Sequence, residues 1–96
     1  MPVFAIVDTK IENAEEYEGY KALAKPIAEK FGGKYLVRGG AMKVVEADLW
    51  QPTRMVVMEF PDMASAEAFY NSEEYAPVRK IRHDNSKCSF VIVEGV

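Results

Sequence analysis

Glu59 and His83 are the residues of this sequence best suited to move a proton. Glu59 lies inside the apolar run MVVMEF, and a carboxylate drawn out of water either pairs with a cation or has a raised pKa, which suits general acid–base catalysis. His83 is the only histidine, and imidazole ordinarily titrates near neutral pH. The alternatives are a structural ion pair of Glu59 with Arg38 or Arg79, and a solvated or helix-capping role for His83.

Arg38 is the main candidate for binding a ligand. It ends the strand-like pentapeptide KYLVR, which stands between the pairs Gly32-Gly33 and Gly39-Gly40. A guanidinium beside bare glycine N–H groups is suited to hold a carboxylate or a phosphate. The alternative is an ion pair at the surface or at a subunit boundary, with the stem of Arg38 packed on the sheet.

A pocket around Arg38 would need further side chains to shape it. Aromatic residues at helical spacing commonly belong to a core, but buried hydroxyl groups still require hydrogen-bond partners. A pocket walled by such groups suits a small, flat or carboxylate-bearing molecule. We name as ligand-binding candidates, besides Arg38, the residues Tyr20, Trp50, Tyr70, Tyr75 and Arg79.

Metal, cofactor and nucleic-acid chemistry find no support in the sequence. One histidine and one cysteine do not make a zinc ligand set, and no P-loop, nucleophile elbow or Gly-x-Gly-x-x-Gly pattern occurs. We therefore expect no metal site and no cofactor. The net charge is −3, and the basic patch Arg79-Lys80-Arg82 lies among acidic residues, so we interpret it as a solvated helical face and expect no nucleic-acid partner.

The sequence also lacks the marks of a membrane or secreted protein. No run approaches the roughly 18 apolar residues of a membrane span, and the N-terminal MPVFAIVDTK has no positively charged start of a signal peptide. Cys88 is the only cysteine and is interpreted as a small apolar residue at the start of a strand. We expect a cytoplasmic protein that does not bind membranes.

These candidates must be positioned by a single domain over residues 1–96 with the element order β-α-β-β-α-β. Apolar, β-forming runs predict strands at 3–8, at 34–38 continued at 41–47, at 53–60 and at 88–95. The order is that of a ferredoxin-like α+β fold with an antiparallel sheet.

The helices are marked by their ends. Asn13 begins the first helix, Pro26 is expected to kink or break it, and Gly32-Gly33 is expected to end it. Asp62 begins a short second helix, and Ser72 resembles a second cap that begins a further helical segment, which continues to about residue 82.

The strands predict a homodimer. Strands 3–8, 53–60 and 88–95 are apolar on both alternations: Phe4 and Ile6 point one way, and Val3, Ala5 and Val7 point the other. A sheet with one solvated face alternates apolar and polar residues. The face away from the helices therefore needs a cover, and the simplest cover is a second copy of the chain.

Gly39-Gly40 is predicted to shift the facing of the second strand by one residue. Either a β-bulge or a two-residue hairpin would bring Tyr35 and Val37 onto one face with Met42 and Val44. Arg38 would then lie on the opposite face. The sequence does not separate these two alternatives.

The runs GGKYLVRGG, VVMEFP, FYNSEEY and VIVEGV together resemble the DUF1330 family. The resemblance covers essentially the whole chain and implies a protomer of the dimeric α+β barrel superfamily, whose sheet packs on that of a partner. It also favours a bulged, bent second strand. The positions that match the family pattern are Arg38, Gly39, Gly40, Glu59, Phe60, Tyr70, Ser72, Tyr75 and Arg79.

The resemblance gives an expectation of function at the level of the superfamily. That superfamily includes cofactor-independent monooxygenases, haem-degrading enzymes and lactone isomerases, and fold alone does not transfer such activities. We expect a homodimer that acts as a cofactor-independent enzyme on a small organic acid or aromatic compound. The alternatives are a ligand-binding module without turnover and a structural dimerisation domain.

Overall fold

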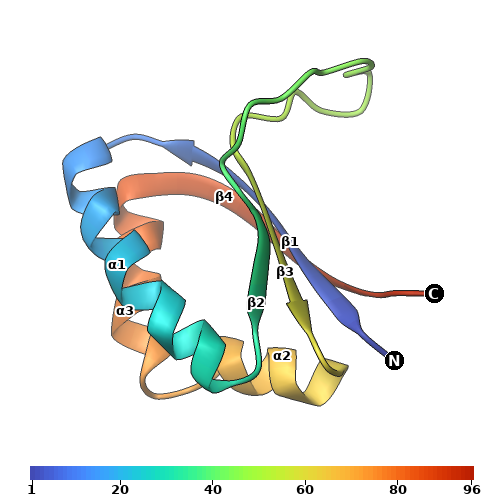
Figure 1. The fold of residues 1–96 in the computed structure, drawn as a ribbon. Helices are drawn as coiled ribbons and strands as arrows, with labels where there is room; N and C mark the ends of the chain where they lie inside the picture. The colour runs from blue at the N-terminus through green and yellow to red at the C-terminus, as the bar shows by residue number, and fades with distance from the viewer.

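The computed structural model describes residues 1–96 as a four-stranded antiparallel sheet with all helices on one face (Figure 1). The strands are β1 (Val3–Ile11), β2 (Lys34–Arg38), β3 (Met55–Phe60) and β4 (Ser86–Glu94). The helices are α1 (Ala14–Lys30), α2 (Met63–Tyr70) and α3 (Tyr75–Asn85). The spatial order β2-β3-β1-β4 confirms the predicted ferredoxin-like arrangement, and the helical segments predicted after Asp62 and Ser72 are α2 and α3. None of these helices has the length and apolar character of a transmembrane segment.

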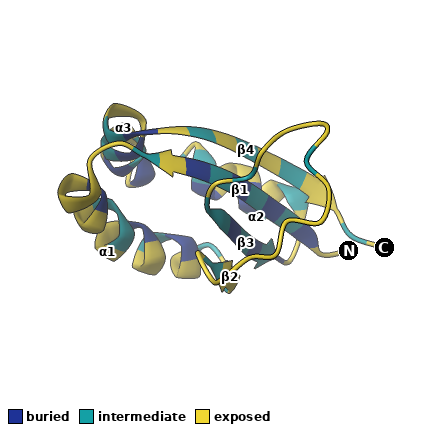
Figure 2. Cartoon of the chain, turned by 90° about the horizontal axis from the view of Figure 1, so that it is seen from above, coloured by how far each residue is buried: buried dark blue, intermediate teal, exposed yellow.

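The core lies between the sheet and the helices. Alternate residues of β1 are buried beneath the helices, and those of β3 continue the same surface. Small residues on α1 let that helix approach closely, while aromatic rings of α2 and α3 fill the wider space. Figure 2 shows the buried positions concentrated on the facing surfaces of these elements. The principal buried residues are Val3, Ala5, Val7, Ala24, Ala28, Val56, Met58, Phe60, Phe69 and Tyr75.

Helix α1 begins and ends as predicted but does not break at Pro26. The side chain of Asn13 accepts a hydrogen bond from the Glu16 N–H at 3.2 Å, and Gly32, with φ of +88°, ends the helix. The predicted break is wrong because Pro26 removes only one backbone donor from the helix. Packing of the buried face, including Ala24 and Ala28, holds the remaining turns in place.

Residues 39–54 form a loop, here called the arm, which extends beyond the end of the sheet (Figure 1). The strand predicted at 41–47 is wrong for the single chain. A strand requires a neighbouring ladder to satisfy its N–H and C=O groups, and residues 41–47 have no strand beside them within one protomer. Large apolar side chains of the arm are consequently exposed, namely Met42, Val44, Val45, Leu49 and Trp50.

The register shift in β2 lies earlier than predicted. It falls between Tyr35 and Val37, so neither a bulge nor a two-residue hairpin occurs at Gly39-Gly40. Tyr35 stands opposite the buried Met58, whereas Val37 stands opposite Val57, on the other face. The shift returns Arg38 to the helix side of the sheet.

The sheet surface away from the helices, here called the open face, carries no helix (Figure 1), and within the chain only residues of the arm lie against part of it. Phe4 and Ile6 of β1 are half-buried there, opposite Val93 and Val91 of β4, which are exposed. Leu36 and Val37 of β2 are also exposed. The strands are therefore apolar on both faces, as their sequences predicted.

Candidate functional site

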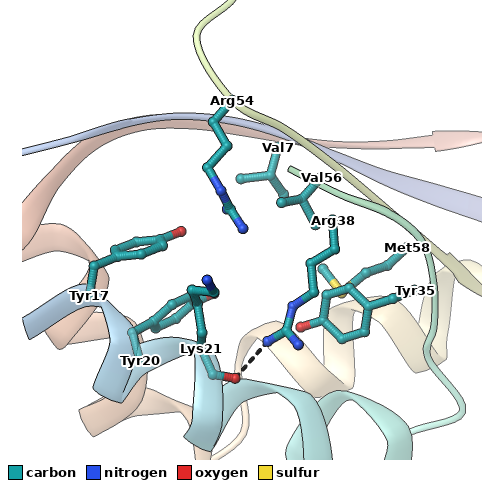
Figure 3. Close-up of a pocket in the computed structure, with 9 residues that line it drawn as sticks. All are labelled: Val7, Tyr17, Tyr20, Lys21, Tyr35, Arg38, Arg54, Val56 and Met58. Carbon is teal, nitrogen blue, oxygen red and sulfur yellow. Dashed lines mark hydrogen bonds between the residues drawn. The ribbon is translucent and has the colours of Figure 1, made fainter. Parts of the chain in front are cut away.

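A small cavity lies between α1 and the part of the sheet formed by β2, β3 and β1 (Figure 3). Its volume is about 20 Å³, which is room for roughly one water molecule. The wall carries two guanidinium groups and three phenol rings but no carboxylate, and its third cation, Lys21, is paired with Glu18 at 3.0 Å. The residues that line the cavity are Val7, Tyr17, Tyr20, Lys21, Tyr35, Arg38, Arg54, Val56 and Met58.

Arg38 enters the cavity because the register shift in β2 directs it to the helix side, opposite Val56. Its Nη2 donates a hydrogen bond to the Lys21 carbonyl oxygen at 2.6 Å, and its Cζ lies 4.6 Å from the centre of the Tyr35 ring (Figure 3). It forms no ion pair within the chain. Arg38 thus faces the cavity with donors still available to a ligand.

Arg54 is the second guanidinium of the cavity, and sequence reasoning did not select it. Its Cζ lies 5.6 Å from the centre of the Tyr17 ring. A Cβ at Gly39 would stand 2.6 Å from Arg54 Nε, so this side chain needs residue 39 to be bare. The signal available in the sequence was Gly39 itself, because a missing side chain beside a strand often marks a close approach by another group.

Asp8 anchors the end of the arm that carries Arg54. It accepts hydrogen bonds from Trp50 Nε1 at 2.8 Å, from the Thr53 N–H and hydroxyl at 2.9 Å, and from the Arg54 N–H at 3.0 Å. Burial acts to raise the pKa of Asp8, but these hydrogen bonds act against it, and the net pKa lies below the usual value. An ionised Asp8 therefore fixes the point from which Arg54 reaches the cavity.

Trp50 lies apart from the Arg38 cavity. It belongs to a separate hollow of about 430 Å³ on the open face, which it shares with Leu49 and residues of β1, β3 and β4. Because the sheet separates the two spaces, Trp50 and Arg38 do not contact one ligand within a single protomer.

The tyrosines near the cavity form a connected aromatic cluster. The Tyr20 and Tyr75 hydroxyl oxygens are 2.7 Å apart, and Tyr75 is completely buried. Burial raises the pKa values of Tyr20 and Tyr75 above the ordinary value of a phenol. It also raises the pKa of Tyr35 to about 12. Of the predicted ligand-binding residues, Tyr20 lines the cavity and Tyr75 supports it from behind.

Arg82 lies in this cluster, and its interpretation as part of a solvated face is wrong. Its side chain is 1% exposed and donates a hydrogen bond from Nη1 to Cys88 Sγ at 2.7 Å. Burial disfavours the charge, but neighbouring groups, Tyr75 first among them, favour it, and the net pKa of Arg82 lies above its usual value. The alternation of charged and apolar residues on α3 concealed this inward-facing position.

Tyr70 and Arg79 lie outside the cavity and contact each other. Arg79 Nη1 donates to the Tyr70 carbonyl oxygen at 2.8 Å, and its Cζ lies 4.8 Å from the centre of the Tyr70 ring. This interaction satisfies a carbonyl at the end of α2. The Tyr70 ring packs on Phe90 with ring centres 5.1 Å apart.

Glu59 and His83 do not line the cavity. Glu59 points to the open face, between Phe4 and Lys34 of the neighbouring strands, and forms no ion pair within the chain. His83 is exposed near the end of α3, where partial burial and the nearby Arg82 lower its pKa. No group of three His, Cys, Asp or Glu side chains is arranged to hold a metal ion.

Residues 2–96 match the family model of DUF1330, a domain of unknown function. The chain belongs to the DUF1330 family. A comparison of this DUF1330 chain with curated proteins finds no match.

Solved structures show the same fold as this DUF1330 chain. A protein of unknown function from Rhodopseudomonas palustris matches with a TM-score of 0.78 and 16% identity over 99% of this chain and 82% of that one. A dimeric ferredoxin-like protein of unknown function from Jannaschia sp. matches with a TM-score of 0.77 and 13% identity over 99% and 100%. SnoaB, a cofactor-independent oxygenase from Streptomyces nogalater, matches with a TM-score of 0.68 and 11% identity over 99% and 93%. At these identities the similarity establishes the fold and leaves the activity open.

Proposed function

We propose that the protein binds the carboxylate of a small organic acid in the cavity between Arg38 and Arg54. The observation that carries the proposal is the pairing of two guanidinium groups that have no carboxylate partner in the chain. Guanidinium groups recognise carboxylates by charge-assisted hydrogen bonds. A volume of about 20 Å³ admits only a group the size of a water molecule, such as one carboxylate oxygen, so the remainder of the acid would lie at the mouth.

Binding without turnover is better supported than proton-transfer catalysis. Neither Glu59 nor His83 lines the cavity, and the raised pKa values of Tyr20 and Tyr35 make these phenols weak acids. No side chain in the cavity is therefore suited to accept a proton near neutral pH.

Cofactor-independent oxygenation of an aromatic acid is the second candidate function. It is favoured by the fold shared with SnoaB, a cofactor-independent oxygenase. Oxygen uptake by the protein with 2,5-dihydroxybenzoate, measured against protein-free solution, tests it. Equal uptake in the two solutions would count against this candidate for that substrate.

Carboxylate binding is tested by calorimetric titration with propionate. Removal of one charge-assisted partner, in Arg38→Ala or Arg54→Ala, should weaken binding by about tenfold or more. Lys25→Ala is the matched control, because it removes a positive charge from an exposed position on α1. Equal weakening in all three variants would show that binding depends only on net charge, and no binding by the unmodified protein would reject the proposal.

We also propose that the open face packs against a second copy of the chain in the cytoplasm. The exposed Val91 and Val93 of β4, together with Leu36 and Val37 of β2, form an apolar surface, and the Jannaschia relative is described as dimeric. Val91→Glu should convert a sedimentation mass of two chains into one of a single chain. Leu23→Glu, on the exposed side of α1, is the control. A single-chain mass for the unmodified protein at micromolar concentration would reject the dimer.

A further inference from the structure

Arg82 is a buried cation without a carboxylate partner. Its Nη1 donates to Cys88 Sγ, its Nε has no hydrogen-bond partner, and it takes part in no ion pair. A guanidinium offers only donors. The groups around it must therefore turn electron-rich atoms toward it, as the Phe90 ring does at 5.3 Å from Cζ.

Tyr75 is the hydroxyl group placed to respond to this cation. It precedes Arg82 by seven residues on the same buried face of α3, and side chains on a helix lean toward its N-terminus, so Arg82 leans toward Tyr75. A positive charge beside a hydroxyl favours an arrangement with the oxygen toward the charge and the hydrogen away from it. The hydroxyl that can receive this hydrogen is that of Tyr20, 2.7 Å away.

The reverse arrangement would leave a buried donor unsatisfied. If Tyr20 donated to Tyr75, the hydrogen of Tyr75 would have no acceptor, although Tyr75 is completely buried. An unpaired buried donor is costly. Tyr75 therefore donates to Tyr20, and the positive charge of Arg82 favours this direction.

In this direction the hydrogen of Tyr20 has no acceptor within the chain, so it is available to a ligand. Tyr20 lines the cavity, and its hydroxyl forms no hydrogen bond to a side chain other than Tyr75. Burial raises the pKa of Tyr20, so its hydroxyl stays protonated near neutral pH. The cavity thus presents a fixed hydrogen-bond donor in addition to Arg38 and Arg54.

We propose that the cavity selects 2-oxo acids, with the carboxylate held by Arg38 and Arg54 and the oxo oxygen accepting a hydrogen bond from Tyr20. The inference rests on the proposed function and specifies its ligand class. Because the cavity has room for roughly one water-sized group, the head group would lie partly at its mouth, and only an oxygen on the carbon next to the carboxylate would reach the same wall. An oxo oxygen is purely an acceptor and so matches a site whose two guanidinium groups offer only donors and whose Tyr20 hydroxyl has a hydrogen to donate. Arg82 and Tyr75 are positioning residues for Tyr20.

The test compares pyruvate with propionate by calorimetric titration, since the two acids differ by the 2-oxo oxygen. The unmodified protein should bind pyruvate about tenfold more tightly, as one added hydrogen bond predicts. Tyr20→Phe should remove this preference, so that the variant binds pyruvate and propionate with equal affinity. Tyr75→Phe should reduce the preference although Tyr20 is present, a result that a merely structural role of Tyr75 would not produce. Tyr70→Phe is the control, because Tyr70 lies outside the cavity.

The outcomes separate this inference from the proposed function. Equal binding of pyruvate and propionate, or a preference that survives in Tyr20→Phe, overturns the 2-oxo selectivity and leaves carboxylate binding intact. If neither acid binds, both the 2-oxo selectivity and the proposed carboxylate binding are overturned. If Tyr20→Phe does not fold, an undiminished preference in Tyr75→Phe overturns the inference in its place.

Discussion

The guanidinium of Arg54 occupies the space that a side chain at Gly39 would need. Its Nε lies 2.6 Å from the position of a Cβ at residue 39, and Gly39 itself has φ of +73°. Gly39 therefore serves the cavity, because its missing side chain admits a second arginine beside Arg38.

Gly39→Ala should weaken both the fold and ligand binding. The left-handed backbone costs about 1–2 kcal/mol for a residue with a Cβ, and displacement of Arg54 should weaken propionate binding as much as Arg54→Ala does. Gly40→Ala is the control, since no atom lies within 4 Å of a Cβ there and its φ is not positive. Urea unfolding and calorimetric titration measure the two effects. Unchanged binding in Gly39→Ala would contradict the account of the glycine.

Asp8 should make the stability of the protein sensitive to acid. Its folded-state pKa lies below the usual value, so its contribution to the free energy of unfolding is present above the unfolded-state pKa, near 3.8. The contribution is lost as the pH falls through the folded-state pKa. Asp8→Asn should reduce stability at neutral pH and reduce its decline in acid. Asp62, whose pKa is also lowered by its helix-capping hydrogen bond to Ser65, should sustain the remaining decline. Parallel pH profiles for the variant and the unmodified protein would argue against this role of Asp8.

The tyrosines should make the protein less stable in alkali. The folded-state pKa values of Tyr20 and Tyr35 lie above the usual 10.0, that of Tyr35 at about 12. Their contribution is therefore complete below pH 10 and is lost as the pH rises from the unfolded-state value through the folded-state value. Tyr20→Phe should flatten this decline. Urea unfolding across the alkaline range measures it, and an undiminished slope in Tyr20→Phe would show that other groups cause it.

Arg82 should contribute selectivity more than stability. A buried charge can often be replaced by an apolar residue of similar volume at little cost, so Arg82→Met should keep the free energy of unfolding within about 1 kcal/mol. Arg82→Ala leaves a cavity and should lower it by about 2–4 kcal/mol. Both variants should lose part of the preference for pyruvate over propionate. An equally large loss of stability in Arg82→Met would show that the charge itself stabilises the core.

Local sequence signals determined the elements of this fold. Apolar runs predicted the strands, Asn13 and Asp62 marked the beginnings of helices, and Gly32 marked the end of α1. Strands apolar on both faces also predicted the uncovered open face. These features are readable because capping, turn geometry and side-chain alternation depend on residues near one another in the chain.

Only the tertiary structure decided which side chains share a site. A register shift at Tyr35–Val37, rather than at the glycines, directs Arg38 toward the helices, and the fold of the arm brings Arg54 beside it. The same contacts separate Glu59 from the cavity. A one-residue change of register reverses the facing of a side chain, and long-range packing determines where that change falls. The sequence therefore identified Arg38 as a candidate, whereas the packed structure supplied its partner.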